Sequence, residues 1–188
     1  PDVLIPGAVI KIKLVAFFNG RSSSSEETLT INRGPYGGDV RITGWDVNAR
    51  NAQALTDDVF ITAVQWVDDD APLSYSFSYG PRGGPQKTAI SLGAKSPKAS
   101  VKFQKPPDGN FTIYCTIYDS WQAKITVAKD LIVEEVVLTE EKENEIFAGM
   151  TTNSDTGDSS GGKQLAGNLA SAVNSQKAKA GRRRLSAS

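Results

Sequence analysis

The chain has 188 residues, 39% of them hydrophobic, and its 21 basic residues balance 21 acidic ones to a net charge of zero. This length suits one or two domains with a real core, and the charge balance argues against a general nucleic-acid binder, which needs a basic face. No histidine is present, so the commonest general base and metal ligand is missing, and the single cysteine, Cys115, excludes an internal disulfide and a cysteine-based zinc site.

The first predicted strands lie in residues 1–32. Residues 8–18, AVIKIKLVAFF, begin with the alternation of apolar and basic residues that indicates a strand. NGRSSSSEE follows as a predicted flexible loop, and TLTIN at residues 28–32 as a second short strand. Because the opening residues read as the middle of a domain, we expect the chain to be a fragment of a longer protein. Any membrane contact is then expected through parts of the protein outside this sequence.

A stretch rich in glycine and proline, RGPYGG at residues 33–38, predicts a hinge before a second set of strands. About seven short strands over roughly 100 residues, with turns every 8–12 residues, are typical of an immunoglobulin-like β-sandwich. We therefore predict an all-β fold for this part of the chain. The predicted strands fall at residues 39–47, 58–66, 72–80, 87–93, 98–104, 110–118 and 122–138, the last continuous or broken near Lys129.

Alternation within these strands predicts the core. PLSYSFSYG at residues 72–80 places large apolar side chains on one face and serines on the other. Cys115 is expected to be a buried thiol on a strand, and one tryptophan, Trp66, is expected in the core, as in many such folds. The predicted core residues are Phe60, Trp66, Leu73, Tyr75 and Phe77.

The last part of the chain, residues 139–188, has a different character. TEEKENEIFAGM is rich in helix-forming residues, whereas TTNSDTGDSSGGK at residues 151–163 resembles a linker. QLAGNLASAVNSQ at residues 164–176 carries apolar residues at helical spacing. We expect a linker and a short amphipathic helix, with a helical or disordered tail that ends in a basic segment.

Three stretches of the sequence carry a resemblance to a known family. They are INRGPYGGDVRIT, LTDDVFITAVQWVDDDAPLSYSFSYG and PPDGNFTIYCTIYDSWQAKIT. Together they closely resemble the REJ (receptor for egg jelly) region of polycystin-family proteins, whose immunoglobulin-like modules are related to PKD repeats and fibronectin type III domains. The matching positions are Asn32, Pro35, Gly37, Gly38, Phe60, Trp66, Asp68, Asp70, Pro72, Leu73, Tyr75, Phe77, Tyr79, Pro107, Gly109, Asp119 and Ala123.

The resemblance covers about residues 29–137 and implies a division of the chain. Residues 1–32 resemble the end of a preceding immunoglobulin-like module, and residues 33–138 a complete PKD/REJ-type β-sandwich. Residues 139–188 form the linker and short helix. One departure is visible, because Trp121 and Gln122 stand where the family usually has an aromatic or small residue and a glycine.

The three consecutive aspartates, Asp68 to Asp70, have three interpretations. Closely spaced carboxylates are typical calcium ligands, which makes Asp68 and Asp70 candidate ligands, but the EF-hand spacing is absent. A pair of catalytic carboxylates would need a pocket or partner that nothing nearby supplies. A turn between two strands, in which aspartate caps the backbone before Pro72, is the interpretation we favour. We therefore predict neither a catalytic residue nor a cofactor, and calcium only as the alternative.

Asn110 opens the sequon Asn110-Phe111-Thr112 and is the predicted glycosylation site. The resemblance implies a non-catalytic structural or adhesion module of a large extracellular or ciliary cell-surface protein. Its implied partners are neighbouring immunoglobulin-like modules, other proteins bound through exposed sandwich faces, and a polycystin channel subunit. Two alternatives stay open: a structural subunit of an extracellular filament, and a carbohydrate-binding sandwich of a secreted hydrolase, for which Trp45, Trp121 and Tyr118 are the candidate aromatics.

Overall fold

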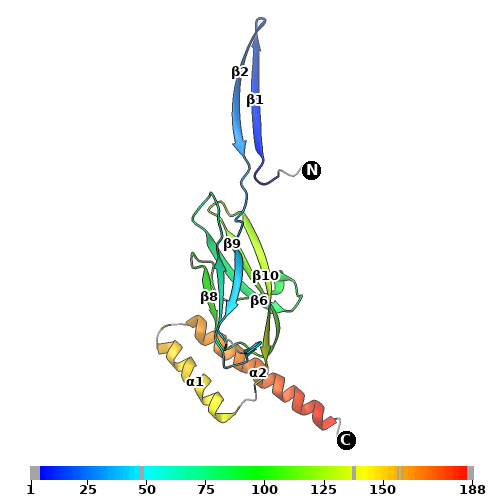
Figure 1. Cartoon of the computed structure of the whole chain (residues 1–188), viewed down its shortest axis with the longest axis vertical. Coiled ribbons are helices and arrows are strands. Elements are labelled where there is room, and N and C mark those ends of the chain that lie inside the picture. The colour runs from blue at the N-terminus through cyan, green and yellow to red at the C-terminus, as the bar shows by residue number, and fades with distance from the viewer. Residues whose placement is uncertain (1–4, 47–48, 137–138, 156, 158, 186–188) are drawn as a thin grey trace.

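A computed structural model of the chain describes residues 5–46, 49–136, 139–155, 157 and 159–185. The described chain forms a two-stranded hairpin, a body of two β-sheets and a pair of helices (Figure 1). The hairpin projects from one end of the two-sheet body and the helices lie at the opposite end. The module is therefore elongated, and its first and last elements point away from each other.

The hairpin pairs β1 (Val9–Phe18) with β2 (Arg21–Thr30) in antiparallel register, from Val9 opposite Thr30 to Phe18 opposite Arg21. Asn19 and Gly20 form its turn with φ of +48° and +74°, as a two-residue turn of a twisted hairpin requires. The prediction of a flexible loop over the four serines at residues 22–25 is wrong, since these residues lie within β2. The backbone of β1 needs a hydrogen-bonding partner whatever side chains that partner carries.

Two sheets form the body, which we call the sandwich. One sheet has the order β3-β5-β8 and the other β4-β10-β9-β6-β7. Neighbouring strands are antiparallel except β4 and β10, which are parallel. Their bounds are β3 Asp39–Thr43, β4 Ala52–Gln53, β5 Val59–Val64, β6 Ser74–Pro81, β7 Ile90–Ser91, β8 Ser100–Phe103, β9 Gly109–Tyr118 and β10 Lys124–Glu134, with a 3-10 turn at Gln86–Thr88.

These bounds confirm the all-β, two-sheet prediction, while the immunoglobulin-like assignment stays a prediction. β10 is continuous through Lys129, so the alternative of a broken strand does not apply. The predicted strand at residues 87–93 is shorter than expected, because the 3-10 turn occupies Gln86–Thr88 and β7 only Ile90–Ser91.

The core fills the space between the two sheets with alternate residues of the facing strands. β9 contributes Ile113, Cys115 and Ile117, all fully buried. Phe77 is buried as expected, and Trp66, Leu73 and Tyr75 are partly buried against the same core. The placement of Phe60 in the core is wrong: its side chain is 42% exposed. β5 turns Val59, Ile61 and Ala63 inward, and strand alternation then forces Phe60 outward.

Two helices, α1 (Glu140–Asp155) and α2 (Ser159–Leu185), close the opposite end of the sandwich (Figure 1). Leu55 of the sandwich packs in one cluster with Ile146 of α1 and Leu169 of α2. Most described residues of the expected linker at 151–163 are helical, and α2 has 27 residues where a short helix was expected. No helix among the described residues combines the length and the apolar character that crossing a membrane requires.

Candidate functional site at the junction of hairpin and sandwich

Residues 31–38 connect the hairpin to the sandwich, and we call this segment with the residues it contacts the junction. The side chain of Asn32 donates a hydrogen bond of 2.6 Å from Nδ2 to Oδ2 of Asp119. Pro35 is fully buried. Tyr36 and Val67 exchange two backbone hydrogen bonds of 3.0 Å. The segment predicted as a glycine and proline hinge is therefore anchored to the sandwich along its length.

At Gly38 the junction leaves no space for a side chain. A Cβ atom at this position would lie 2.4 to 2.6 Å from three ring atoms of Trp66. The Trp66 ring therefore rests directly on the glycine backbone, and its Nε1 donates a hydrogen bond of 3.2 Å to the carbonyl oxygen of Asp39. No other residue type leaves room for the ring, since a side chain would occupy its place.

Asp119 is the buried centre of the junction, with 1% of its surface exposed. Besides Asn32, its carboxylate accepts a hydrogen bond of 2.8 Å at Oδ1 from the backbone N–H of Ala123. The N–H of Asp119 returns a bond of 3.1 Å to the Ala123 carbonyl oxygen. A buried carboxylate costs free energy unless its oxygens are paired. Through these hydrogen bonds, Asp119 connects the turn between β9 and β10 to residues 31–38.

The unusual Gln122 lies in this same turn and has a φ of +69°, a conformation that glycine adopts most easily. Its Oε1 accepts a hydrogen bond of 2.5 Å from Lys95 Nζ, which also lies 4.5 Å from the centre of the Tyr118 ring. The departure from the family pattern thus keeps the glycine-like backbone and adds a side-chain contact across the end of the sandwich.

The three aspartates form the turn expected of them. Asp68 Oδ1 accepts a hydrogen bond of 2.8 Å from the N–H of Asp70, an Asx turn, and the Asp70 carbonyl oxygen accepts one of 3.0 Å from the N–H of Ser120. Asp68, Asp70 and Asp119 also bring one carboxylate oxygen each within 4.8 Å of one another. Within the described chain, Asp68 Oδ2 is a buried atom without a hydrogen-bond partner. This oxygen marks the place where a cation would bind if the junction takes one, but hydrogen bonds already use Asp68 Oδ1 and both Asp119 oxygens.

A hollow of about 740 Å³ lies beside the aspartates, between the hairpin and the sandwich. The guanidinium of Arg33 stacks on the ring of Tyr36 at 3.7 Å from its centre. Trp121, at the turn between β9 and β10, lines the hollow and is 74% exposed. The junction is thus anchored to the sandwich and carries two exposed aromatic side chains, Tyr36 and the more exposed Trp121.

The other predicted site residues lie away from the junction. Asn110 is exposed in β9. Burial raises the pKa of Cys115 to about 12, so its thiol stays neutral and inert. Trp45 packs against the core, which separates it from Trp121 as a candidate binding aromatic. The family pattern contains Asn32 and Asp119, but nothing in the local sequence indicates that they bond to each other.

Comparison with known proteins identifies one family. The family model described as REJ domain matches residues 1–172, from the hairpin through the sandwich into α2. No curated protein matches the chain. REJ domains are non-catalytic modules of polycystin-family proteins, which are membrane proteins with extracellular domains. Because this match covers most of the chain, the chain belongs to the REJ domain family.

Proposed function

We propose that this chain is a non-catalytic structural and adhesion module in the extracellular part of a large, polycystin-like protein of the cell surface or the cilium. The observation that carries the proposal is the anchored junction. A spacer must hold the direction in which the chain enters it, and here Asn32, Pro35 and Tyr36 each fix that direction by a contact with the sandwich.

The elongated shape supports a place in a series of modules. The hairpin and the helices lie at opposite ends of the sandwich (Figure 1), so a pull on the chain passes through the junction and the strands. Antiparallel strands resist extension through their ladders of hydrogen bonds. Asp119 joins the junction to β9 and β10 at the point where such a force would enter.

The hairpin itself supports the proposal that residues 1–32 complete a neighbouring immunoglobulin-like module. Alternate residues of β1, including Ile12, Leu14 and Phe18, form an apolar face and are 55%, 72% and 78% exposed. A two-stranded hairpin is only marginally stable in water by itself, and an exposed apolar face of this kind usually marks a contact. Other partners, including a polycystin channel subunit, are proposed to bind the exposed faces of the sandwich.

A second candidate function is a subunit of an extracellular filament, because the same apolar face suits a neighbouring copy of the chain. Sedimentation of the full chain separates the two proposals. A module whose apolar hairpin face packs on the preceding module of the same polypeptide stays monomeric at micromolar concentration. A filament subunit forms concentration-dependent oligomers that Leu14→Ser abolishes. The carbohydrate-binding alternative gains no support, since Trp45 packs against the core and leaves no row of exposed aromatics with Trp121.

The spacer function is tested by measuring how firmly the hairpin is held. Spin labels at Ser22→Cys in β2 and at Lys98→Cys, an exposed position of the sandwich, report one distance between the two parts by electron spin resonance in a Cys115→Ala background. We expect a narrow distribution that broadens on Asn32→Ala. A broad distribution in the unmodified junction would contradict the proposal, since a flexible linker transmits no direction.

A further inference from the structure

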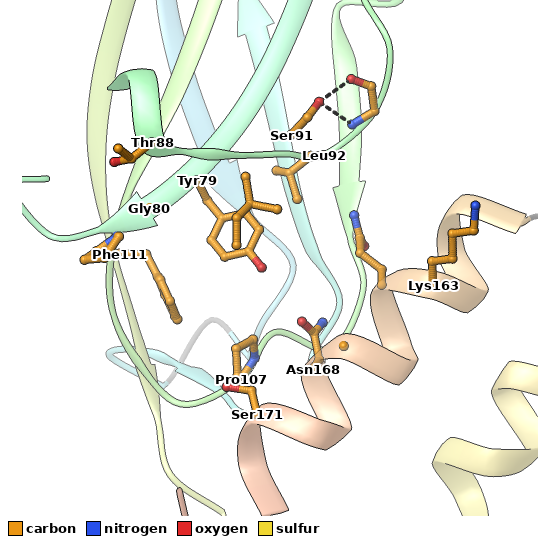
Figure 2. Close-up of a pocket in the computed structure, with 15 residues that line it drawn as sticks. Tyr79, Gly80, Thr88, Ser91, Leu92, Pro107, Phe111, Lys163, Asn168 and Ser171 are labelled. Atoms are coloured by element: carbon orange, nitrogen blue, oxygen red, sulfur yellow. Dashed lines mark hydrogen bonds between the residues drawn. The ribbon is translucent and has the colours of Figure 1, made fainter. Parts of the chain in front are cut away.

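A pocket of about 650 Å³ lies at the end of the sandwich opposite the junction, where α2 crosses the edge of the five-stranded sheet (Figure 2). Tyr79, Leu92 and Phe111 line it from the sandwich, and Lys163 and Asn168 from α2. Figure 2 shows Tyr79 and Leu92 facing Asn168 across the pocket. A volume of this size, with mainly apolar walls and few polar groups, is typical of a site for a small ligand.

The walls of the pocket are firmly held. The Tyr79 ring packs against Phe103 and Phe111, with ring centres 4.5 and 5.6 Å away. Asn168 Nδ2 donates hydrogen bonds of 2.8 and 3.1 Å to the carbonyl oxygens of Gln104 and Lys105, which fixes α2 on the sandwich. The pocket is therefore a property of the folded module and does not depend on the position of a loose helix.

Among the polar groups of the pocket, the Tyr79 hydroxyl and the Lys163 ammonium have no partner within the described chain. The Tyr79 hydroxyl makes no hydrogen bond to a described residue. Burial raises the pKa of Tyr79, so this hydroxyl stays protonated and can donate a hydrogen bond. Lys163 is exposed and forms no ion pair with a described residue, whereas Lys105 nearby pairs with Glu145 at 2.7 Å. Lys163 is also the only charged side chain among the residues that line this part of the described structure.

From these observations we propose that the pocket binds a single-chain amphiphile with an anionic head group, of the fatty-acid type. The chain lies among Leu92, Phe111 and the Tyr79 ring, where its burial drives binding. The head group pairs with the ammonium of Lys163 at the open side, and the Tyr79 hydroxyl donates to an oxygen of the ligand. The charge of Lys163 selects an anion over a cation of equal chain length.

The proposal is tested by titrating the full chain with dodecanoate below its micelle concentration, using calorimetry. We expect saturable binding of one ligand per chain, and affinity for dodecyltrimethylammonium weaker by about tenfold or more. Lys163→Glu should reverse this preference. Tyr79→Phe should weaken dodecanoate binding by about fivefold, because only the hydroxyl is removed.

Gly167→Phe gives the sharpest test, because Gly167 lines the pocket and a Cβ there meets no atom within 4 Å. The Cβ atom has room at this position, and replacing a glycine inside a helix favours the helix, so we expect the fold to be retained while the ring occupies the pocket. Ala166→Phe is the matched control, one residue earlier on α2, exposed and outside the lining. We expect Gly167→Phe to weaken binding by at least about tenfold and Ala166→Phe to leave it unchanged.

Binding that survives Gly167→Phe but is lost in Leu14→Ser would place the ligand on the apolar face of the hairpin and overturn the proposal. Equal affinity for the anionic and the cationic amphiphile would overturn it as well, since Lys163 would then have no role. Absence of saturable binding would leave the pocket without this ligand class and would also refute it. None of these outcomes bears on the spacer function, which rests on the other end of the module.

Discussion

Replacement of Gly38 by alanine tests how tightly the junction is built. The backbone of Gly38 does not need a positive φ, so alanine causes no backbone strain and acts only through its Cβ atom. That atom would lie 2.4 Å from Cδ2 of Trp66, and the ring must therefore move and give up its hydrogen bond to Asp39. Overpacking costs about 1–3 kcal/mol and a lost hydrogen bond about 1 kcal/mol, so we expect a loss of stability of about 3 kcal/mol.

Urea unfolding followed by circular dichroism measures this loss, and Gly37→Ala is the matched control. Gly37 has a φ of +78° and open space around its Cβ position, so its replacement costs about 1 kcal/mol through backbone strain alone. A double-mutant cycle isolates the contact: in a Trp66→Ala background, Gly38→Ala should cost less than about 0.5 kcal/mol. An equal cost of Gly38→Ala in both backgrounds would refute this reasoning, because the penalty would then not come from the ring.

Four further predictions concern single groups. Burial raises the pKa of Cys115 from 9.0 to about 12, so the buried neutral thiol contributes its full stability below pH 9.0 and that stability is lost as the pH rises toward 12. Urea unfolding should show a loss of about 1.4 kcal/mol between pH 8 and pH 10, and Cys115→Ala should remove this loss. Asn32→Ala leaves a buried carboxylate oxygen unpaired and should cost about 2 kcal/mol, while Asn51→Ala, which breaks an exposed bond of 2.8 Å, should cost less than about 0.5 kcal/mol. In a secreting eukaryotic cell, the chain should carry one N-glycan, seen as a mobility shift that N-glycosidase removes and Asn110→Gln prevents. Millimolar calcium should leave the melting temperature unchanged; a rise that Asp68→Asn abolishes would make the aspartates a cation site.

Strand alternation was enough to predict the sandwich wherever one face of a strand is clearly polar. β6 has serines on one side, and β9 alternates apolar residues with Thr112, Tyr114 and Thr116, so both strands were placed correctly within a few residues. In β9, however, both faces are buried from Thr112 to Ile117, so its threonine face does not lie in water as the alternation suggests. β5 was harder, because Val59 to Val64 are apolar on both faces except for Thr62. The local pattern could not decide whether Phe60 or Ile61 points inward. In the structure, Thr62 Oγ1 and Ser100 Oγ lie 3.1 Å apart on the outer face, which is also the face of Phe60.

The segments that were predicted wrongly are those whose structure depends on contacts with residues distant in the sequence. The serines of β2 favour a loop by their own preference, yet they pair with β1. The segment at residues 151–163 looks like a linker, but Asn153 Nδ2 donates a hydrogen bond of 3.0 Å to Gln104 Oε1 on the sandwich. Tertiary contacts override local propensity in both places, and such contacts cannot be read from a window of neighbouring residues.

The junction shows why its residues form a motif although they lie far apart in the sequence. Asn32 and Asp119 are separated by 87 residues. Gly38 and Trp66 come into contact only when β3 pairs with β5 and residues 31–38 pack against the sandwich. The two contacts depend on the same placement of residues 31–38. The Trp66 ring packs on Gly38, and Asn32 donates the hydrogen bond that satisfies Oδ2 of the buried Asp119 carboxylate. Loosening of residues 31–38 would therefore expose the buried Asp119 carboxylate and separate Trp66 from Gly38 together. This coupling favours one direction of entry into the sandwich, which is what the proposed role as a rigid module in a series of domains requires.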